Sequence, residues 1–192
     1  LSLTPERTRL QALVLSVCRI FEGLARQKNL QWRVELDPQS DCDVLIDPTR
    51  FKQVLSNLLS NAIKFTPEGE VSLKLRVDPL SSQRLAVSVQ VQDSGIGISA
   101  FDQQRLFSPF VQAGNGQQSG RQGSGLGLVI SRTLCEMMGG RLQLESTLGG
   151  GTRVDINLEL VALQPLPASA LEERAVQAPT RPLTILVVDD YP

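Results

Sequence analysis

The segment that most constrains this chain is residues 51–66, FKQVLSNLLSNAIKFT. Its apolar residues recur at helical spacing, which predicts an amphipathic helix with one face in a core. Asn57, Asn61 and Lys64, spaced by four and three residues, lie on one stripe along the edge of that face. Amide oxygens can ligate a hard cation such as magnesium, and a lysine can neutralise a phosphate. The stripe is therefore a candidate site for both, and the alternative is two polar residues at a core edge beside a surface lysine.

The composition excludes several classes of protein. A hydrophobic fraction of 41% and a charged fraction of 20% are ordinary for a globular protein, and 192 residues suffice for one sizeable domain. With a net charge of -1, we expect no nucleic-acid partner and no membrane contact by this chain. No apolar run reaches about 18 residues, and we expect no signal peptide. Three cysteines without zinc or CxxC spacing fit structural thiols in a reducing cytosol: Cys18, Cys42 and Cys135.

Hydrophobic periodicity predicts the order helix, two strands, helix, two strands, loop, helix, two strands. The expected helices span 4–28, 51–66 and 126–138, and the expected strands span 30–37, 42–46, 71–77, 85–91, 141–145 and 153–160. Pro5 suits the first position of the first helix, with Thr4 or Ser2 as its cap, and Asp47 caps the central helix. A polar loop is expected at 78–84. This order predicts an α/β two-layer sandwich, in which three helices cover one face of a mixed sheet.

The ends of the chain differ from its middle. We expect the main domain to cover residues 10–160, with 1–9 belonging to an upstream region. Prolines and alanines over 161–182 predict a linker, and the apolar run LTILVV at 183–188 is typical of a buried parallel strand. The chain begins without Met and stops two residues after an acidic pair, so we expect it to be a piece of a longer protein. It contains no histidine.

Residues 93–98, DSGIGI, follow a predicted strand. The glycines permit a tight turn and the close approach of a flat ligand. An aspartate at position 93 can accept a hydrogen bond from an exocyclic amine of a base. A dinucleotide fingerprint is the competing interpretation, because Gly95, Gly97 and Ala100 fit GxGxxA. We disfavour it, because the predicted order is not βαβ and no acidic residue near 115–122 could hold a ribose.

Residues 123–128, GSGLGL, open a predicted helix. Bare backbone amides and the helix dipole form an anion site there, suited to phosphates. No Gly-Lys-Ser/Thr follows, so the segment is not a P-loop, and the alternative is a flexible linker running into an amphipathic helix. The preceding segment, 111–125, is rich in Gly, Gln and Ser and predicts a mobile loop. Phe107 and Phe110 precede this loop and are expected to anchor it.

Together these segments resemble the catalytic ATP-binding domain of sensor histidine kinases, which has the Bergerat-type fold of the wider gyrase and chaperone ATPase superfamily. The resemblance includes five motifs in order: the N box at 51–66, the G1 box at 93–97, the F box at 107–110, the G2 box at 123–128 and a Gly-Thr motif at 149–152. In addition, TILVVDD at 184–190 resembles the first strand and acidic pair of a receiver domain. That resemblance implies that the parent is a hybrid sensor kinase of a bacterial two-component system.

The resemblance implies ATP and Mg²⁺ as cofactors and gives roles to single residues. Asn61 would ligate the magnesium ion, and Asn57 would contact a phosphate or a metal-bound water. Lys64 would contact a phosphate. Asp93 would bind the adenine amino group, with Thr152 supporting it through a water molecule.

The same resemblance implies a second set of contacts, around the base and the phosphates. The residues expected to shape the adenine pocket are Gly95, Gly97 and Ile98. The residues expected to cradle the phosphates are Gly123, Gly125 and Gly127, with Leu126 and Leu128 between and after them. Segment 99–122 would form the ATP lid, in which Arg121 would present a basic group to the γ-phosphate and Phe107 and Phe110 would be the anchor.

Asn57 stands where the hydrolysing members of the superfamily have a glutamate that acts as a general base. An amide cannot take a proton from water, so Asn57 suits transfer of the phosphoryl group to a histidine rather than to water. Phosphoryl transfer depends mainly on positioning and charge neutralisation. With no histidine in the chain, the implied acceptor lies on an upstream dimerisation helix of a homodimeric parent, anchored in the inner membrane with this domain in the cytoplasm. The other implied partners are the receiver and phosphotransfer domains of the relay and a response regulator.

Two alternatives remain open at this point. The Gln-rich lid leaves room for a degenerate nucleotide-binding or docking domain that regulates a partner kinase without catalysis. A water-hydrolysing motor is disfavoured by Asn57 and by the receiver-like tail.

Overall fold

The computed structural model describes residues 2–103, 105–106 and 126–163. Over these residues the chain forms a seven-stranded sheet in the order β1-β3-β7-β5-β4-β2, with β6 pairing with β7. The strands are β1 Glu6–Arg9, β2 Gln31–Leu36, β3 Asp43–Ile46, β4 Glu70–Ser81, β5 Arg84–Asp93, β6 Arg141–Thr147 and β7 Gly151–Ala162. The helices are α1 Leu10–Gln27, α2 Pro48–Phe65, α3 Ala100–Gln103 and α4 Gly127–Met137, with a 3-10 turn, η1, at Pro38–Ser40.

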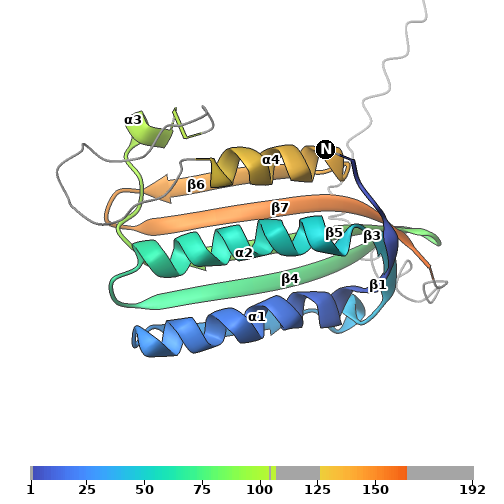
Figure 1. Cartoon of the computed structure of the whole chain (residues 1–192), viewed down its shortest axis with the longest axis horizontal. Helices are drawn as coiled ribbons and strands as arrows, with labels where there is room; N and C mark the ends of the chain where they lie inside the picture. The colour runs from blue at the N-terminus through green and yellow to red at the C-terminus, as the bar shows by residue number, and fades with distance from the viewer. Residues whose placement is uncertain (1, 104, 107–125, 164–192) are drawn as a thin grey trace, which may run out of the picture.

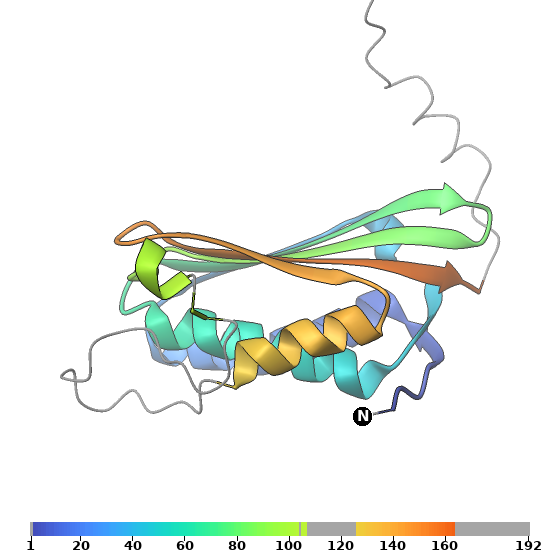
Figure 2. The same cartoon turned by 90° about the horizontal axis from the view of Figure 1, so that it is seen from above.

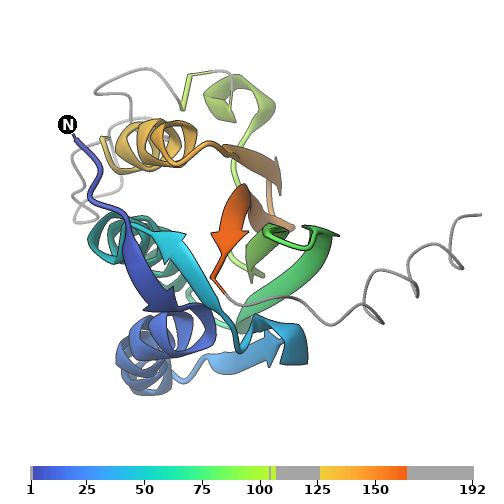
Figure 3. The same cartoon turned by 90° about the vertical axis from the view of Figure 1, so that its right-hand side faces the viewer.

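Helices α1, α2 and α4 lie side by side over one face of the sheet (Figures 1 and 2), and the two layers are seen end-on in Figure 3. Strands β2 and β4 pair in parallel, and the other pairs are antiparallel, so the sheet is mixed. Strand β5 alternates buried and half-buried positions, as expected when only one face of a sheet is covered. The predicted α/β two-layer sandwich is therefore confirmed.

Helix α2 occupies the middle of the helical layer, between α1 and α4 (Figure 1). It begins as predicted, because Oδ1 of Asp47 accepts a hydrogen bond from the Arg50 N–H at 3.0 Å and Pro48 opens the first turn. Its buried face holds Phe51, Val54, Leu55, Leu58, Leu59, Ala62 and Ile63. This face fixes the rotation of the helix, and it leaves the stripe of Asn57, Asn61 and Lys64 half-buried at the edge of the core.

The first helix begins at Leu10, so the prediction that it begins at residue 4 is wrong. Residues 6–9 form β1, which pairs antiparallel with β3. The Leu10 N–H donates to the carbonyl of Cys42 at 3.0 Å, and the Arg9 guanidinium pairs with Asp41. Thr4 does not cap the helix and Pro5 is not in its first turn, because Arg9 occupies the N-cap position. The Thr4 N–H donates to Asp47. Pairing with a distant strand outweighed the local helical pattern, since the partner of β1 is more than thirty residues away in the sequence.

The structure also differs from the prediction at other element boundaries. Strands β4 and β5 run into the expected loop at 78–84 and leave only residues 82–83 between them. Pro79 is tolerated there because the register shifts at a bulge between Pro79 and Ser81. Strand β7 continues to Ala162, beyond the expected 160. The elements α3 and η1 were not predicted, and the receiver-like segment 183–192 lies outside the described residues.

The three cysteines form no disulfide in the structure. Burial raises the pKa of the Cys18 thiol to about 11 and that of Cys135 to about 12, so both stay protonated at neutral pH. This agrees with their interpretation as structural thiols. Within the described ranges, no helix has the length and apolar character needed to span a bilayer.

Because Phe51 is fully buried at the start of α2, Phe51→Ala should create a cavity and lower the free energy of unfolding by about 3–5 kcal/mol. Lys52→Ala is the matched control at the exposed neighbouring position and should change it by about 0.5 kcal/mol or less. Urea unfolding of the purified chain measures both values. A loss below about 1 kcal/mol for Phe51→Ala would contradict the central position of α2.

Candidate functional site

Four segments that are distant in the sequence meet at one end of the molecule, on the left in Figure 1. They are the C-terminal half of α2, the loop after β5, the turn between β6 and β7, and the N-terminus of α4. The Ile96 N–H donates to the carbonyl of Phe65 at 3.1 Å, which fastens the loop to α2. The Gly149 N–H donates to the carbonyl of Ile96 at 2.8 Å, which fastens the β6–β7 turn to the same loop. The predicted G1 segment and Gly-Thr motif are thus brought together.

Asp93 ends β5 and lies directly opposite Thr152 in the sheet register. Its Oδ1 accepts hydrogen bonds from the Gly95 N–H at 2.8 Å and the Thr152 N–H at 3.3 Å. Burial raises the pKa of Asp93 above the ordinary aspartate value, and hydrogen bonds from Gly95, Thr152 and the Thr66 hydroxyl oppose this shift only partly. The structure therefore holds a half-buried carboxylate in a fixed orientation at the end of the sheet.

Gly95 and Gly97 permit the close approach of three backbone segments. A Cβ added at Gly95 would lie 2.8 Å from the Thr66 Oγ1 and would overlap the carbonyl of Phe65. Gly97 has a φ of 64°, and a Cβ there would overlap the carbonyl of Thr147. Larger residues at either position would force the loop away from α2 or from the β6–β7 turn.

A small hydroxyl network supports this loop. Oγ of Ser146 accepts a hydrogen bond from the Ile98 N–H at 2.8 Å and lies 2.9 Å from the Thr152 Oγ1. Ile98 is half-buried beside this network. Thr152 therefore touches Asp93 through its N–H and Ser146 through its hydroxyl, whereas its water-mediated contact with a base stays a prediction.

The amide of Asn57 connects α2 to α4. Its Nδ2 donates to Oγ of Ser131 at 2.9 Å, and Ser131 is fully buried. A Cβ added at Gly127 would overlap the Asn57 Oδ1, so the backbone of the first turn of α4 lies directly against the amide. Leu126 occupies the N-cap position of α4 without a side-chain capping bond, and Leu128 is half-buried within the first turn. The N-terminus of α4 is thus placed beside the stripe on α2.

Asn61 and Lys64 lie one and two turns further along α2 and are both half-buried. The Nζ of Lys64 is 5.0 Å from the centroid of the Phe65 ring. Five predicted site residues lie outside the described residues: Phe107, Phe110, Arg121, Gly123 and Gly125.

Only the beginning of segment 99–122 is described. Helix α3 is tied to the site because the side-chain amide of Gln103 donates to the carbonyls of Ile98 and Ser146, each at 2.8 Å. Leu106 is buried.

Sequence reasoning missed Thr66, Ser131 and Ser146 as site residues. The two serines could have been noticed in the sequence, because each falls at a position that the periodicity of its helix or strand assigns to the buried face. Ser131 precedes the buried Leu134 and Cys135 by three and four positions on α4. Ser146 shares the alternation of β6 with the buried Leu142.

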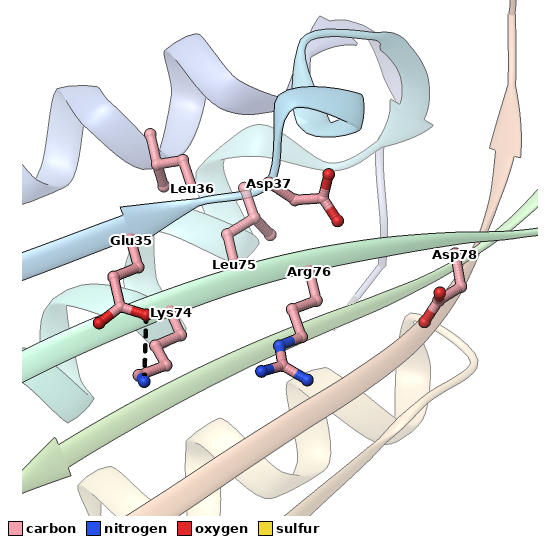
Figure 4. Close-up of a pocket in the computed structure, with 7 residues that line it drawn as sticks. All are labelled: Glu35, Leu36, Asp37, Lys74, Leu75, Arg76 and Asp78. Carbon is pink, nitrogen blue, oxygen red and sulfur yellow. Dashed lines mark ion pairs between the residues drawn. The ribbon is translucent and has the colours of Figure 1, made fainter. Parts of the chain in front are cut away.

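A hollow on the described surface lies elsewhere, on the helix-free face of the sheet (Figure 4). It is lined by charged side chains of β2 and β4, among them Glu35 and Lys74, whose charged groups pair at 3.0 Å. None of its lining residues belongs to the four segments that meet around Asp93 and Asn57. We therefore do not assign it to the candidate site.

Comparison with known proteins gives a family match over residues 46–162, to the model of histidine kinase-, DNA gyrase B- and HSP90-like ATPases. The virulence sensor protein BvgS of Bordetella bronchiseptica is 45% identical, in an alignment that covers 98% of this chain and 16% of the relative. The sensor protein EvgS of Escherichia coli K12 is 38% identical, with 99% of this chain and 16% of the relative covered. The chain thus spans about a sixth of the length of these relatives.

Solved structures agree with this match. Full-length ShkA in complex with AMPPNP is similar with a TM-score of 0.69 and 27% identity, covering 85% of this chain and 33% of that one. The catalytic domain of the histidine kinase ThkA is similar with a TM-score of 0.63 and 28% identity, covering 85% of this chain and all of that one. The fold is that of histidine kinase catalytic domains, as the resemblance implied.

Asp93→Asn tests the cost of burying this carboxylate. A raised pKa in the folded state means that Asp93 contributes most to stability below the pKa of the unfolded chain, and that this contribution is lost as pH rises through the folded pKa. Asparagine keeps an acceptor for Gly95 and Thr152 but does not titrate. The variant should therefore be at least as stable as the wild type at pH 7 and should lose this advantage as the pH falls toward about 4.

Thermal unfolding of the ligand-free chain between pH 4 and 8 measures this difference. Asp78→Asn, at an exposed position, controls for the loss of one carboxylate elsewhere. If Asp93→Asn were less stable than the wild type at pH 7 by an amount independent of pH, the carboxylate would be stabilising and the account of its burial would be wrong.

Proposed function

The chain belongs to the histidine kinase-, DNA gyrase B- and HSP90-like ATPase family, and on that premise we propose that its site binds ATP with Mg²⁺ and presents the γ-phosphate to a histidine of a longer protein. The family match and the similarity to sensor proteins and histidine kinase structures identify it as a catalytic ATP-binding domain of the histidine kinase type. The longer protein's activity and partners are part of the proposal, because the chain spans about a sixth of its relatives.

The observation that carries the proposal is the half-buried carboxylate of Asp93, held by the N–H groups of Gly95 and Thr152. A carboxylate accepts hydrogen bonds, and adenine offers an exocyclic amine where guanine has a carbonyl. Glycine at 95 and 97 lets the loop that follows Asp93 lie against α2 and the β6–β7 turn, and a Cβ at Gly95 would lie 2.9 Å from Asp93 Oδ1. A flat base would bind here with its amine directed at the carboxylate.

The phosphates would lie between α2 and the start of α4. The first turn of α4 approaches Asn57 at Gly127, and a helix N-terminus favours anions. Lys64 lies on the same stripe, where it would contact a phosphate. The glycines at 123 and 125 and the basic Arg121 would complete this part of the site.

Mg²⁺ fits the donors on this stripe. Within the described ranges, no group of three or more His, Cys, Asp or Glu side chains could hold a metal ion. Mg²⁺ does not need such a group when a nucleotide is bound, because it commonly takes one or two protein ligands and completes its shell with phosphate oxygens and water. The half-buried amide of Asn61 would supply that protein ligand.

Transfer to a histidine fits the chemistry of Asn57. Its Nδ2 donates to Ser131, and an amide has no basic atom with which to activate water. The chain contains no histidine, so the acceptor would lie in another part of the longer protein, on the dimerisation helix implied by the resemblance. Receiver and phosphotransfer domains of the same relay and a response regulator are the further partners that we propose, with a homodimeric parent anchored in the inner membrane.

Nucleotide titration tests the base-recognition part of this proposal. A non-hydrolysable ATP analogue with Mg²⁺ should bind the purified chain in the micromolar range, which corresponds to about -8 kcal/mol. The matching GTP analogue should bind far more weakly, because sites built around such a hydrogen bond discriminate by up to about 10⁴–10⁵. Asp93→Ala should lose ATP binding, whereas the exposed Asp78→Ala should retain it. Comparable affinities for the two nucleotides would rule out adenine recognition by Asp93.

A further inference from the structure

The chain enters the domain through β1, and a buried carboxylate lies between this segment and the start of α2. Asp47 is 6% exposed. Its Oδ2 accepts a hydrogen bond from the Thr4 N–H at 2.9 Å, and its Oδ1 accepts one from the Arg50 N–H at 3.0 Å. Its carbonyl accepts the Phe51 N–H at 3.0 Å. One residue therefore joins the incoming backbone to the first turn of α2.

The incoming segment is also fastened to the sheet. The guanidinium of Arg9 makes two bonds to Asp41, at 2.7 and 2.8 Å, and Arg7 pairs with Asp43 at 2.6 Å. Both arginine side chains are about half exposed or more, so each ion pair contributes only a little to stability. The contact at Asp47 is more costly to lose, because its carboxylate is buried and hydrogen bonds to buried charged groups contribute more than exposed ion pairs.

Helix α2 connects this contact to the candidate nucleotide site. The fully buried Phe51 and Leu55 lie on the same helix, between the Asp47 contact and Asn57. Asn57 lies nine residues after Pro48, which is about 14 Å along a helix axis. The Asp47 contact thus lies at the N-terminal end of α2, and Asn57, Asn61 and Lys64 lie along its C-terminal half.

We propose that Asp47 is a positioning residue that couples the incoming segment, residues 2–9, to α2 and through it to the nucleotide site. A shift of the incoming segment withdraws the Thr4 N–H from Asp47 and loosens the first turn of α2. The positions of Asn57 and Asn61 then depend on the conformation of residues 2–9. The second half of this inference rests on the proposed nucleotide binding, and the first half does not.

The charge state of Asp47 supports this role. Burial alone would raise the pKa of Asp47, but hydrogen bonds from the N–H groups of Arg50, Thr4 and Thr49 and the charge of Arg50 hold it below the ordinary value. The carboxylate stays ionised at neutral pH and accepts hydrogen bonds both from the incoming segment and from the first turn of α2.

Two variants break the contact from its two sides. Thr4→Pro removes the donating N–H, and Thr4→Ala is its matched control because it keeps that N–H. Asp47→Ser keeps an oxygen that can cap α2 but has no second oxygen to reach Thr4. The measurements, made on the whole 192-residue chain, are amide hydrogen exchange at Arg50 and Phe51 and the dissociation constant of a non-hydrolysable ATP analogue with Mg²⁺.

Thr4→Pro and Asp47→Ser should each speed exchange at Arg50 and Phe51 by roughly fivefold and weaken nucleotide binding severalfold, whereas Thr4→Ala should match the wild type. Combining Thr4→Pro with Asp47→Ser should add no further loss, because both remove the same contact. Equal behaviour of Thr4→Pro and Thr4→Ala, or fully additive losses in the double variant, would overturn the proposal. If the wild type bound no nucleotide, the proposed function would fail, while the exchange comparison would still decide the coupling between Thr4 and α2.

Discussion

The packing of one face of α2 into the core is the constraint on which the rest of this structure depends. Phe51, Leu55 and Leu59 are fully buried, and this burial is worth several kcal/mol more than any single polar contact at the site. The core therefore dictates the rotation of α2, and the polar stripe has to lie at its edge. Half-burying an amide is costly without a partner, and the hydrogen bond from Asn57 to Ser131 offsets that cost while aligning α4.

The site at the end of the sheet depends on close backbone contacts. Glycine at 95 and 97 lets the loop after β5 lie against α2 and the β6–β7 turn, and the hydroxyl of Ser146 joins that turn to the loop. The same contacts hold Asp93 where burial disfavours its charge. Asp93 orders this loop through the N–H groups of Gly95 and Thr152, and its burial raises its pKa. A perturbed carboxylate in a fixed orientation agrees with a role in binding a ligand that has a hydrogen-bond donor.

Local patterns in the sequence were enough to predict the sandwich, the Asp47 cap and the stripe on α2, because each of these depends on spacing along one element. The incoming strand β1 could not be predicted, since residues 6–9 have no period of their own and are held by pairing with β3. Ser131 and Ser146 were missed because their partners lie 74 and 48 residues away, at Asn57 and Ile98. Composition predicted a loop over 111–125 but could not define its contacts, and these residues lie outside the described part of the chain.

The central claim is that this domain presents the γ-phosphate of ATP to a histidine of the longer protein. The most direct test incubates that full-length protein with Mg²⁺ and ATP labelled at the γ-phosphate, beside an Asn61→Ala variant shown to be folded. The account predicts label on a histidine outside this chain in the wild type, as an acid-labile and base-stable bond, and only background label in the variant. ATP binding without any label on the wild-type protein would contradict it, and would favour a domain that regulates a partner kinase without catalysis.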